Sequence, residues 1–328
     1  SLPLPGVDRF VEIRSPKGKQ DFNPADYRSL YRYCFPKPDE QSPWSSMIGT
    51  VSDMVRVDSG TEGSEQLKRI YGLLRYRDMV AMSNKRVVGF TSFVTMPLDN
   101  DNAVVYSLYS GIADRAFMSS QYGCQENFRG SGLVSLFMLM RHGVAQEDAR
   151  MLGYARNVAG TMMDASFIGQ ANDAQEIRET KTRLEIYQHL GALVLMLDTG
   201  SKCFVTPCFQ PALAEDSNPL LMHLLFRERQ VDTGRFAQVS EISLALARNL
   251  ARAYASSYDW QSTPGEINDM RSFMDTRFAA AKRAVLVPLE HLPNMAALAS
   301  MDPLLKAQVE RDHGPVDEHA KRIRTALR

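Results

Sequence analysis

The feature that most constrains the fold is an Arg-Gly-Ser-Gly turn followed at once by an amphipathic helix. Apolar residues recur after the turn at the spacing of one helical face; they are Leu133, Leu136, Phe137, Met140 and Val144. Residues 116–125, before the turn, are expected to form a strand. A strand, a glycine turn and a helix in succession indicate a mixed α/β fold in which the helix packs on a sheet.

The turn has the composition of a phosphate-binding cradle. Its two glycines let the backbone approach a ligand closely, and the first N–H groups of the following helix favour an anion. Arg129 adds a positive charge. The residues expected to bind a phosphate or pyrophosphate are Arg129, Gly130, Ser131, Gly132 and Leu133. A plain glycine-containing turn is the alternative that this segment alone leaves open.

Two well-characterised phosphate motifs are excluded. The chain lacks Gly-x4-Gly-Lys-Ser/Thr, so the turn is not a P-loop. It is not the dinucleotide-binding fingerprint either, because Ser135 stands where that motif has its third glycine.

Three segments match known motifs in a familiar order. The first is Phe128 with Arg129-Gly-Ser-Gly-Leu-Val134, which fits Arg/Gln-x-x-Gly-x-Gly/Ala at the Arg and the key Gly. The second, from Tyr187 to Gly191, has a Tyr followed by Leu-Gly and a predicted strand. The third is a predicted strand upstream of both, at residues 85–93, which resembles the third strand of the family that carries the other two motifs. Together they resemble the GNAT superfamily of acyl-CoA-dependent N-acyltransferases over about residues 8 to 208.

Two positions depart from the pattern of that superfamily. Val134 replaces the usual final Gly or Ala of the pyrophosphate motif, where its side chain could crowd the ligand. Thr180 stands where an Asn is common, about two turns before the Tyr.

The resemblance implies transfer of an acyl group, expected to be acetyl, from acyl-CoA to a primary amine of a small molecule, an amino acid or a peptide. It implies that Tyr187 protonates the departing thiolate and that a strand N–H near Cys124 or Gln125 binds the oxyanion. Glu126 and Asp114 are the candidates for the base, with a solvated turn residue as the plain alternative for Glu126. Cys124 is interpreted as a small buried hydrophobe rather than as a nucleophile.

Two other functions compete with this one. A GNAT-fold protein without catalysis could bind acyl-CoA as a sensor, or act as an interaction scaffold; Val134 and Thr180 favour that reading. A nucleotide-binding module with an unrelated cradle would instead prefer ATP or NAD to coenzyme A.

The remaining pattern predicts a mixed, mostly antiparallel sheet flanked by helices. Strands are expected at residues 9–14, 79–82, 87–96, 103–109, 116–125, 149–155, 192–197 and 202–206. Helices are expected at residues 24–34, 65–76, 133–145 and 182–190. The rest is expected to be a long loop around Trp44, at residues 36–64, and a polar insertion that contains some helix, at residues 157–180.

The composition changes near residue 210. Residues 1–210 are predicted to form the GNAT-like domain and residues 211–328 a helical extension. Thr263-Pro264-x-Glu266 is a capping box that predicts a helix start, and the tail from His313 is expected to fray. The extension could form a homodimer surface, a cap over the acceptor or a separate interaction domain.

Composition narrows the classes of partner. The 38 basic and 38 acidic residues balance, which argues against broad binding to nucleic acid or to an anionic membrane. No apolar run approaches the ~20 residues that span a bilayer, and the first residues do not resemble a signal peptide. Four cysteines are too few for a disulfide framework, so we expect a cytoplasmic protein, and no metal site is predicted.

Overall fold

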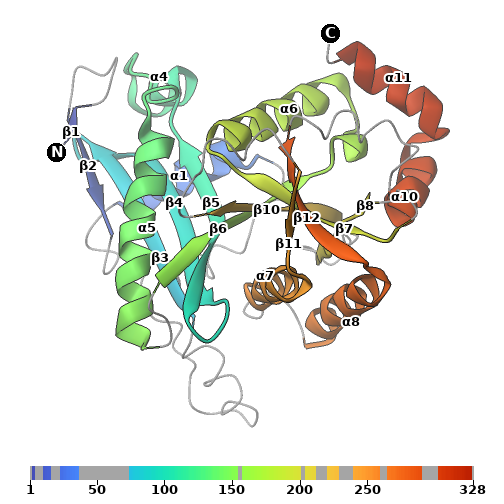
Figure 1. Ribbon diagram of the computed structural model, residues 1–328. Coiled ribbons are helices and arrows are strands. Elements are labelled where there is room, and N and C mark those ends of the chain that lie inside the picture. Colours follow the sequence, from blue (N-terminus) through green and yellow to red (C-terminus); the bar gives the residue numbers. More distant parts are fainter. Residues whose placement is uncertain are drawn as a thin grey trace. The chain divides into compact units, whose positions relative to one another are not determined.

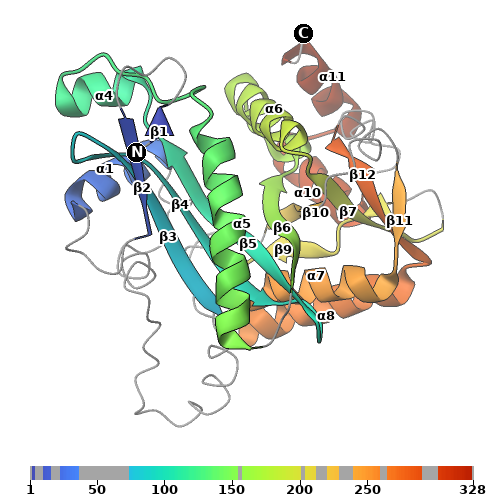
Figure 2. The same ribbon diagram turned by 60° about the vertical axis from the view of Figure 1, so that its left-hand side comes forward.

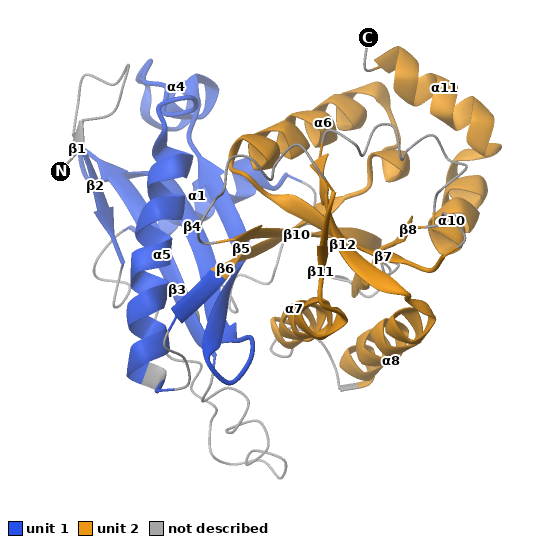
Figure 3. Ribbon diagram, in the orientation of Figure 1, with its two compact units in different colours: residues 1–159, 213–217 blue, residues 160–212, 218–328 orange. Residues whose placement is uncertain are grey.

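The computed structural model of the 328-residue chain describes residues 2–3, 10–15, 23–36, 74–153, 157–200, 204–211, 220–228, 239–258, 264–289 and 302–326. The chain forms two compact units, residues 1–159 with 213–217 and residues 160–212 with 218–328 (Figure 3). Both contain a largely antiparallel sheet flanked by helices, so the predicted mixed α/β class is confirmed. The first long stretch of the chain that belongs to one unit ends at Ala159.

The sheet of the first unit is an antiparallel meander in which consecutive strands pair (Figure 1). Its strands are β1 (Leu2–Pro3), β2 (Phe10–Arg14), β3 (Arg75–Ser83), β4 (Arg86–Pro97) and β5 (Asn102–Ile112). The strands expected at residues 9–14, 87–96 and 103–109 are confirmed.

Helices cover both faces of this sheet (Figure 2). They are α1 (Pro24–Cys34) and α5 (Leu133–Leu152), whereas the shorter α4 (Arg115–Tyr122) follows the end of β5. A Cβ atom on Gly89 would lie 3.0 Å from Leu133 of α5, whereas the ring of Phe90 packs on Tyr27 of α1 with centroids 4.9 Å apart. Because neighbouring residues of a strand point to opposite faces, α5 and α1 lie on opposite sides of the sheet.

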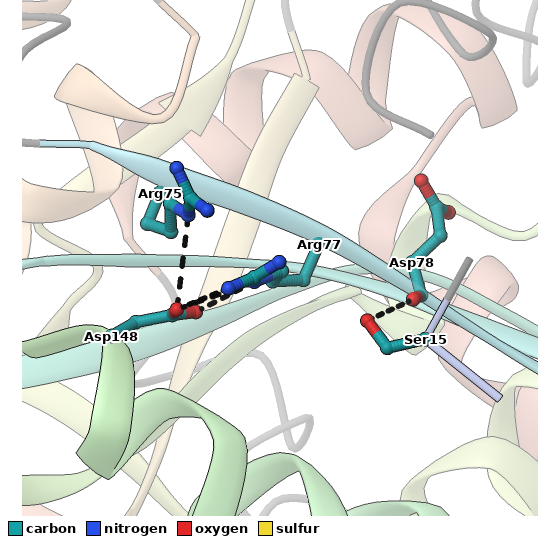
Figure 4. A network of polar contacts seen from close by, with 5 residues as sticks. All are labelled: Ser15, Arg75, Arg77, Asp78 and Asp148. Atoms are coloured by element: carbon teal, nitrogen blue, oxygen red, sulfur yellow. Dashed lines mark hydrogen bonds and ion pairs between the residues drawn. The ribbon is translucent and has the colours of Figure 1, made fainter. Parts of the chain in front are cut away.

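A buried carboxylate fastens the C-terminal half of α5 to β3 (Figure 4). The side chain of Asp148 is 1% exposed and lies 2.6 Å from Nη2 of Arg77 and 3.7 Å from Nε of Arg75. A buried charge is costly unless it is paired, and these two guanidinium groups supply the pairing. Figure 4 also shows the Ser15 hydroxyl, which donates to the backbone oxygen of Asp78 at 3.3 Å and ties the end of β2 to β3.

The strands that follow pair antiparallel in the order β6-β10-β7-β12-β11. These strands are β6 (Asn157–Ser166), β7 (Leu193–Asp198), β10 (Leu220–Glu228), β11 (Ser240–Ile242) and β12 (Arg283–Pro288). Two short strands extend it, β8 (Phe204–Val205) on β7 and β9 (Cys208–Gln210) on β10. Thus β10 lies between two strands that precede it in the sequence.

The helices of the second unit include both expected and unexpected ones. They are the 3-10 helix η3 (Ile168–Gln170) and the α-helices α6 (Ala174–His189), α7 (Leu244–Ser256), α8 (Pro264–Ala280), α10 (Pro303–His313) and α11 (Val316–Ala326). Helix α8 begins at Pro264, as the capping box predicts. The polar tail is ordered rather than frayed, because α11 buries Ile323 and Ala320, and Nε2 of His319 lies 2.9 Å from the backbone oxygen of Gly169.

Several expectations for single segments were wrong. Residues 149–152 continue α5 instead of starting a strand, and residues 157–166 form β6 instead of a polar insertion. The part beyond residue 211 contains β10, β11 and β12, so it is not purely helical. Arg75 and Tyr76 begin β3 rather than end a helix.

Other expectations fall outside the described residues. These are the loop around Trp44, the helix expected from residue 65 as far as residue 73, and Cys203. Among the residues that are described, no helix is both long and apolar enough to cross a bilayer.

Candidate functional site

In the Arg-Gly-Ser-Gly turn, the serine is buried and hydrogen-bonded, whereas the space beside both glycines is open. Gly130 and Gly132 have φ angles of +78° and +83°, a region that glycine enters without a steric penalty. A Cβ atom at either position would meet no heavy atom within 4 Å. Ser131 between them is buried, and its hydroxyl donates to the backbone oxygen of Phe128 at 2.7 Å. The glycines are therefore required by the backbone and leave open space in front of it.

The N-terminus of α5 opens directly from this turn. The helix begins at Leu133, as predicted, and no side chain caps it. Leu133 is buried and anchors the first turn, whereas Val134 is 37% exposed. The first N–H groups of a helix lack partners within it and carry a partial positive charge. An open turn before such an end can bind a phosphate group.

Arg129 lies beside the turn in an organised polar group. Its side chain is 57% exposed, and Nη1 lies 3.2 Å from Oδ2 of Asp114. The Nε–H group donates to the backbone oxygen of Ile112 at 3.4 Å. Arg129 and Asp114, both predicted from the sequence, are thus brought together.

Asp114 is surrounded by donors. The Tyr33 hydroxyl lies 2.8 and 3.0 Å from its two carboxylate oxygens, and the Phe117 N–H donates to Oδ1 at 2.9 Å. Burial opposes ionisation of Asp114, but the hydrogen bonds from Phe117 and Tyr33 and the charge of Arg129 outweigh it and lower the pKa of this carboxyl. A carboxylate stabilised in this way is a weak proton acceptor. Its contacts suit Asp114 to holding Arg129 rather than to deprotonating an amine.

The segment before the cradle is a helix, so the expected strand at residues 116–125 was wrong. Asp114 caps the N-terminus of α4, and Gly123 ends the helix with a φ of +66°. These two caps favour a helix over a strand. The N–H of Cys124 follows the helix and donates to the backbone oxygen of Met118 at 3.3 Å. This N–H is therefore not the strand donor that was expected to bind an oxyanion.

The side chains after α4 form a small cluster of their own. The Cys124 thiol lies 3.7 Å from Oε2 of Glu126 and 3.8 Å from Nη1 of Arg86. The Arg86 guanidinium in turn stacks 4.7 Å from the ring centroid of Tyr122. Glu126 is half-buried and contacts Cys124, so it is more than a solvated turn residue. Gln125 is exposed.

Tyr187 belongs to the second unit, whereas the cradle belongs to the first. It lies in the last turn of α6 and is half-buried, and its backbone oxygen accepts from the Ala192 N–H at 3.0 Å. Arg227 completes this helix end, because its Nε–H donates to the backbone oxygen of Leu190 at 2.6 Å. Thr180, earlier on the helix, is buried.

Two residues of the cradle region were missed by sequence analysis. The contact of Tyr33 with Asp114 spans 81 positions, so no local signal marked it. Cys34 follows it; burial raises the pKa of this thiol to about 11, against the effect of nearby Arg129. Cys34 is therefore a neutral thiol near pH 7.

No protein-family model matches the chain, and no curated protein matches it. Several solved structures match at low identity. Ard1 from Thermoplasma volcanium shares 16% identity at a TM-score of 0.34, over 66% of this chain and 97% of its own. A GNAT-family acetyltransferase from Streptococcus pneumoniae shares 14% at 0.32, over 67% and 99%.

A GNAT-family acetyltransferase from Elizabethkingia anophelis, solved with acetyl-CoA bound, shares 12% identity at a TM-score of 0.29, over 66% of this chain and 97% of its own. The two GNAT-family structures come from the superfamily that the sequence motifs resemble. At these TM-scores the likeness carries no inference about activity, which has to be argued from the residues of this chain.

Proposed function

We propose that this protein is an N-acyltransferase that moves an acyl group, acetyl in the simplest case, from acyl-CoA to a primary amine of a small molecule, an amino acid or a peptide. The observation that carries the proposal is the open turn of Gly130 and Gly132, which leads into an uncapped helix N-terminus beside the exposed Arg129. Such an arrangement suits the pyrophosphate of coenzyme A.

The described residues fit that substrate. The pyrophosphate would accept hydrogen bonds from the backbone N–H groups of residues 132–134, with Arg129 as the side-chain cation. The space in front of both glycines gives the anion room to reach these N–H groups. Val134 stands in the first turn of α5 and is 37% exposed, and we expect its side chain to limit the approach of the ligand.

The chemistry is direct transfer. The neutral amine attacks the thioester carbonyl to form a tetrahedral oxyanion, which collapses with cleavage of the carbon–sulfur bond. The amine loses one proton, and the coenzyme A thiolate gains one. We propose Tyr187 as the donor to the thiolate, and Glu126, directly or through water, as the acceptor of the amine proton.

An activity assay tests the proposal. Purified protein with acetyl-CoA and a panel of primary amines should release free thiol, detected with a thiol reagent, only when both substrates are present. Tyr187→Phe should lower kcat and leave the Kd for coenzyme A unchanged. If coenzyme A binds but no amine in the panel is acylated, the result favours the acyl-CoA sensor instead. A preference for ATP over coenzyme A would favour the nucleotide-binding alternative.

A further inference from the structure

We propose that Tyr33 and Asp114 are positioning residues that hold the guanidinium of Arg129 at the mouth of the phosphate cradle. The inference rests on the proposed function in one respect, namely that coenzyme A is the ligand of the cradle. The arrangement of the three side chains does not depend on it.

Asp114 connects three parts of the first unit. Its carboxylate accepts the Tyr33 hydroxyl from α1, at 2.8 and 3.0 Å, and the Phe117 N–H from α4, at 2.9 Å. It also lies 3.2 Å from Nη1 of Arg129. The ring of Tyr33 packs on Phe117 with centroids 5.1 Å apart. Hydrogen bonds from two helices therefore fix the carboxylate independently of its contact with the guanidinium.

The guanidinium of Arg129 is held at two points, Nη1 and Nε. Nη1 faces Asp114, and the Nε–H group donates to the Ile112 backbone oxygen at the end of β5. The following turn is tied to the same strand end, because the Phe128 N–H donates to the Ala113 backbone oxygen at 3.1 Å. A side chain that is 57% exposed would otherwise sample many rotamers. Two anchors restrict it before a ligand arrives.

The sign of one effect separates positioning from simple charge neutralisation. If Asp114 only neutralised the charge of Arg129, its removal would strengthen binding of a phosphate, because a negative charge that repels the ligand would be gone. If Asp114 positions Arg129, its removal weakens binding, because the ligand must then restrict a free arginine side chain. Immobilising such a side chain corresponds to about a 2- to 10-fold change in affinity.

A double-mutant cycle with coenzyme A as the probe tests this. Tyr33→Phe keeps every charge and the aromatic ring, and Asp114→Asn keeps a residue that caps helices well. Each substitution should raise the Kd for coenzyme A by about 2- to 10-fold in the otherwise native protein. Neither should raise it further in an Arg129→Ala background, since both act through Arg129.

Tyr258→Phe is the matched control. It also removes a tyrosine hydroxyl that donates to an aspartate, Asp164 at 3.3 Å, but it does so in the second unit. Its Kd for coenzyme A should equal that of the native protein. An equal loss of affinity in both backgrounds, or tighter binding by Asp114→Asn, would overturn the positioning role.

A second readout needs no ligand. The Nε–H signal of Arg129 in ¹⁵N NMR spectra should exchange slowly with water in the native protein and faster in Tyr33→Phe and Asp114→Asn. Unchanged exchange in both variants refutes the positioning role even if coenzyme A does not bind. Failure of coenzyme A to bind the native protein, together with faster exchange in the variants, would refute the proposed ligand and leave the positioning intact.

Discussion

The ion pair between Asp148 and two arginines leads to a prediction about stability. The control for it is the neighbouring residue, Glu147. Asp148→Ala removes a carboxylate that is 1% exposed and leaves Arg77 and Arg75 without it beneath α5. Glu147→Ala is the control, because Glu147 precedes it on the same helix and pairs with Arg150 at 3.7 Å where both side chains are largely exposed. The two variants make the same kind of truncation in different surroundings.

The expected magnitudes differ because the surroundings differ. Breaking a buried ion pair by removing one partner costs about 3–5 kcal/mol, whereas exposed pairs contribute little. The side chain of Arg75 is 30% exposed and keeps some contact with water, so the lower end applies. We expect Asp148→Ala to lower the free energy of unfolding by about 3 kcal/mol. Glu147→Ala should change it only slightly.

Urea titration followed by circular dichroism measures both variants. The midpoint of the transition that includes α5 should fall clearly for Asp148→Ala and stay in place for Glu147→Ala, with equal slopes. Near-equal midpoints for the two variants would refute the reasoning, because burial of the ion pair would then contribute nothing to stability. A loss in Asp148→Ala that Arg77→Met does not share would show that Arg77 is not the main partner.

Three further predictions concern packing, pH and the ligand. Gly111→Ala should destabilise the protein by about 1–3 kcal/mol in the same urea titration, since its Cβ atom would lie 2.5 Å from the ring of Phe90. Burial lowers the pKa of His223 from its ordinary 6.5 to about 3. Between pH 6.5 and about 3, His223 is therefore protonated in the unfolded chain but neutral in the folded protein. The free energy of unfolding should accordingly fall as the pH is lowered through this window, by up to about 1.4 kcal/mol per pH unit. His223→Gln should give a flatter curve of unfolding free energy against pH in that window. Val134→Ala should strengthen coenzyme A binding in a calorimetric titration and change stability by less than about 1 kcal/mol, because its side chain is partly exposed.

Elements with strong local signals could be predicted from the sequence. Helix α1 begins at Pro24, as expected, and the side chain of Asn23 before it accepts from the Ala25 N–H at 3.0 Å. The glycine turn marked the start of α5 at Leu133. Caps and turns depend on residues close together in the chain, so their signals survive in the sequence.

Elements that depend on distant partners could not be predicted. Gly160 interrupts the pattern of β6, yet a Cβ atom there would lie 2.8 Å from the ring of Phe226 on β10. The glycine therefore serves a close approach between strands that are far apart in the sequence. The helix α4 was missed for a different reason: its caps, Asp114 and Gly123, are local, but the residues between them also suit a strand.

The candidate site was predictable in the same uneven way. The residues of the cradle could be named from the sequence because the turn and the helix that form it are contiguous. The contacts that orient Arg129 could not, since Tyr33 lies on α1 and reaches Asp114 only in the folded chain. Residues that bind a phosphate through the backbone leave a sequence signal, whereas the side chains that position them do not.

Calorimetric titration with coenzyme A, with ATP as the control ligand, tests the central claim most directly. The account predicts micromolar binding of coenzyme A that is lost in Arg129→Glu, with weaker or no binding of ATP. Absence of binding by any coenzyme A species to the folded native protein would contradict the assignment as an acyltransferase.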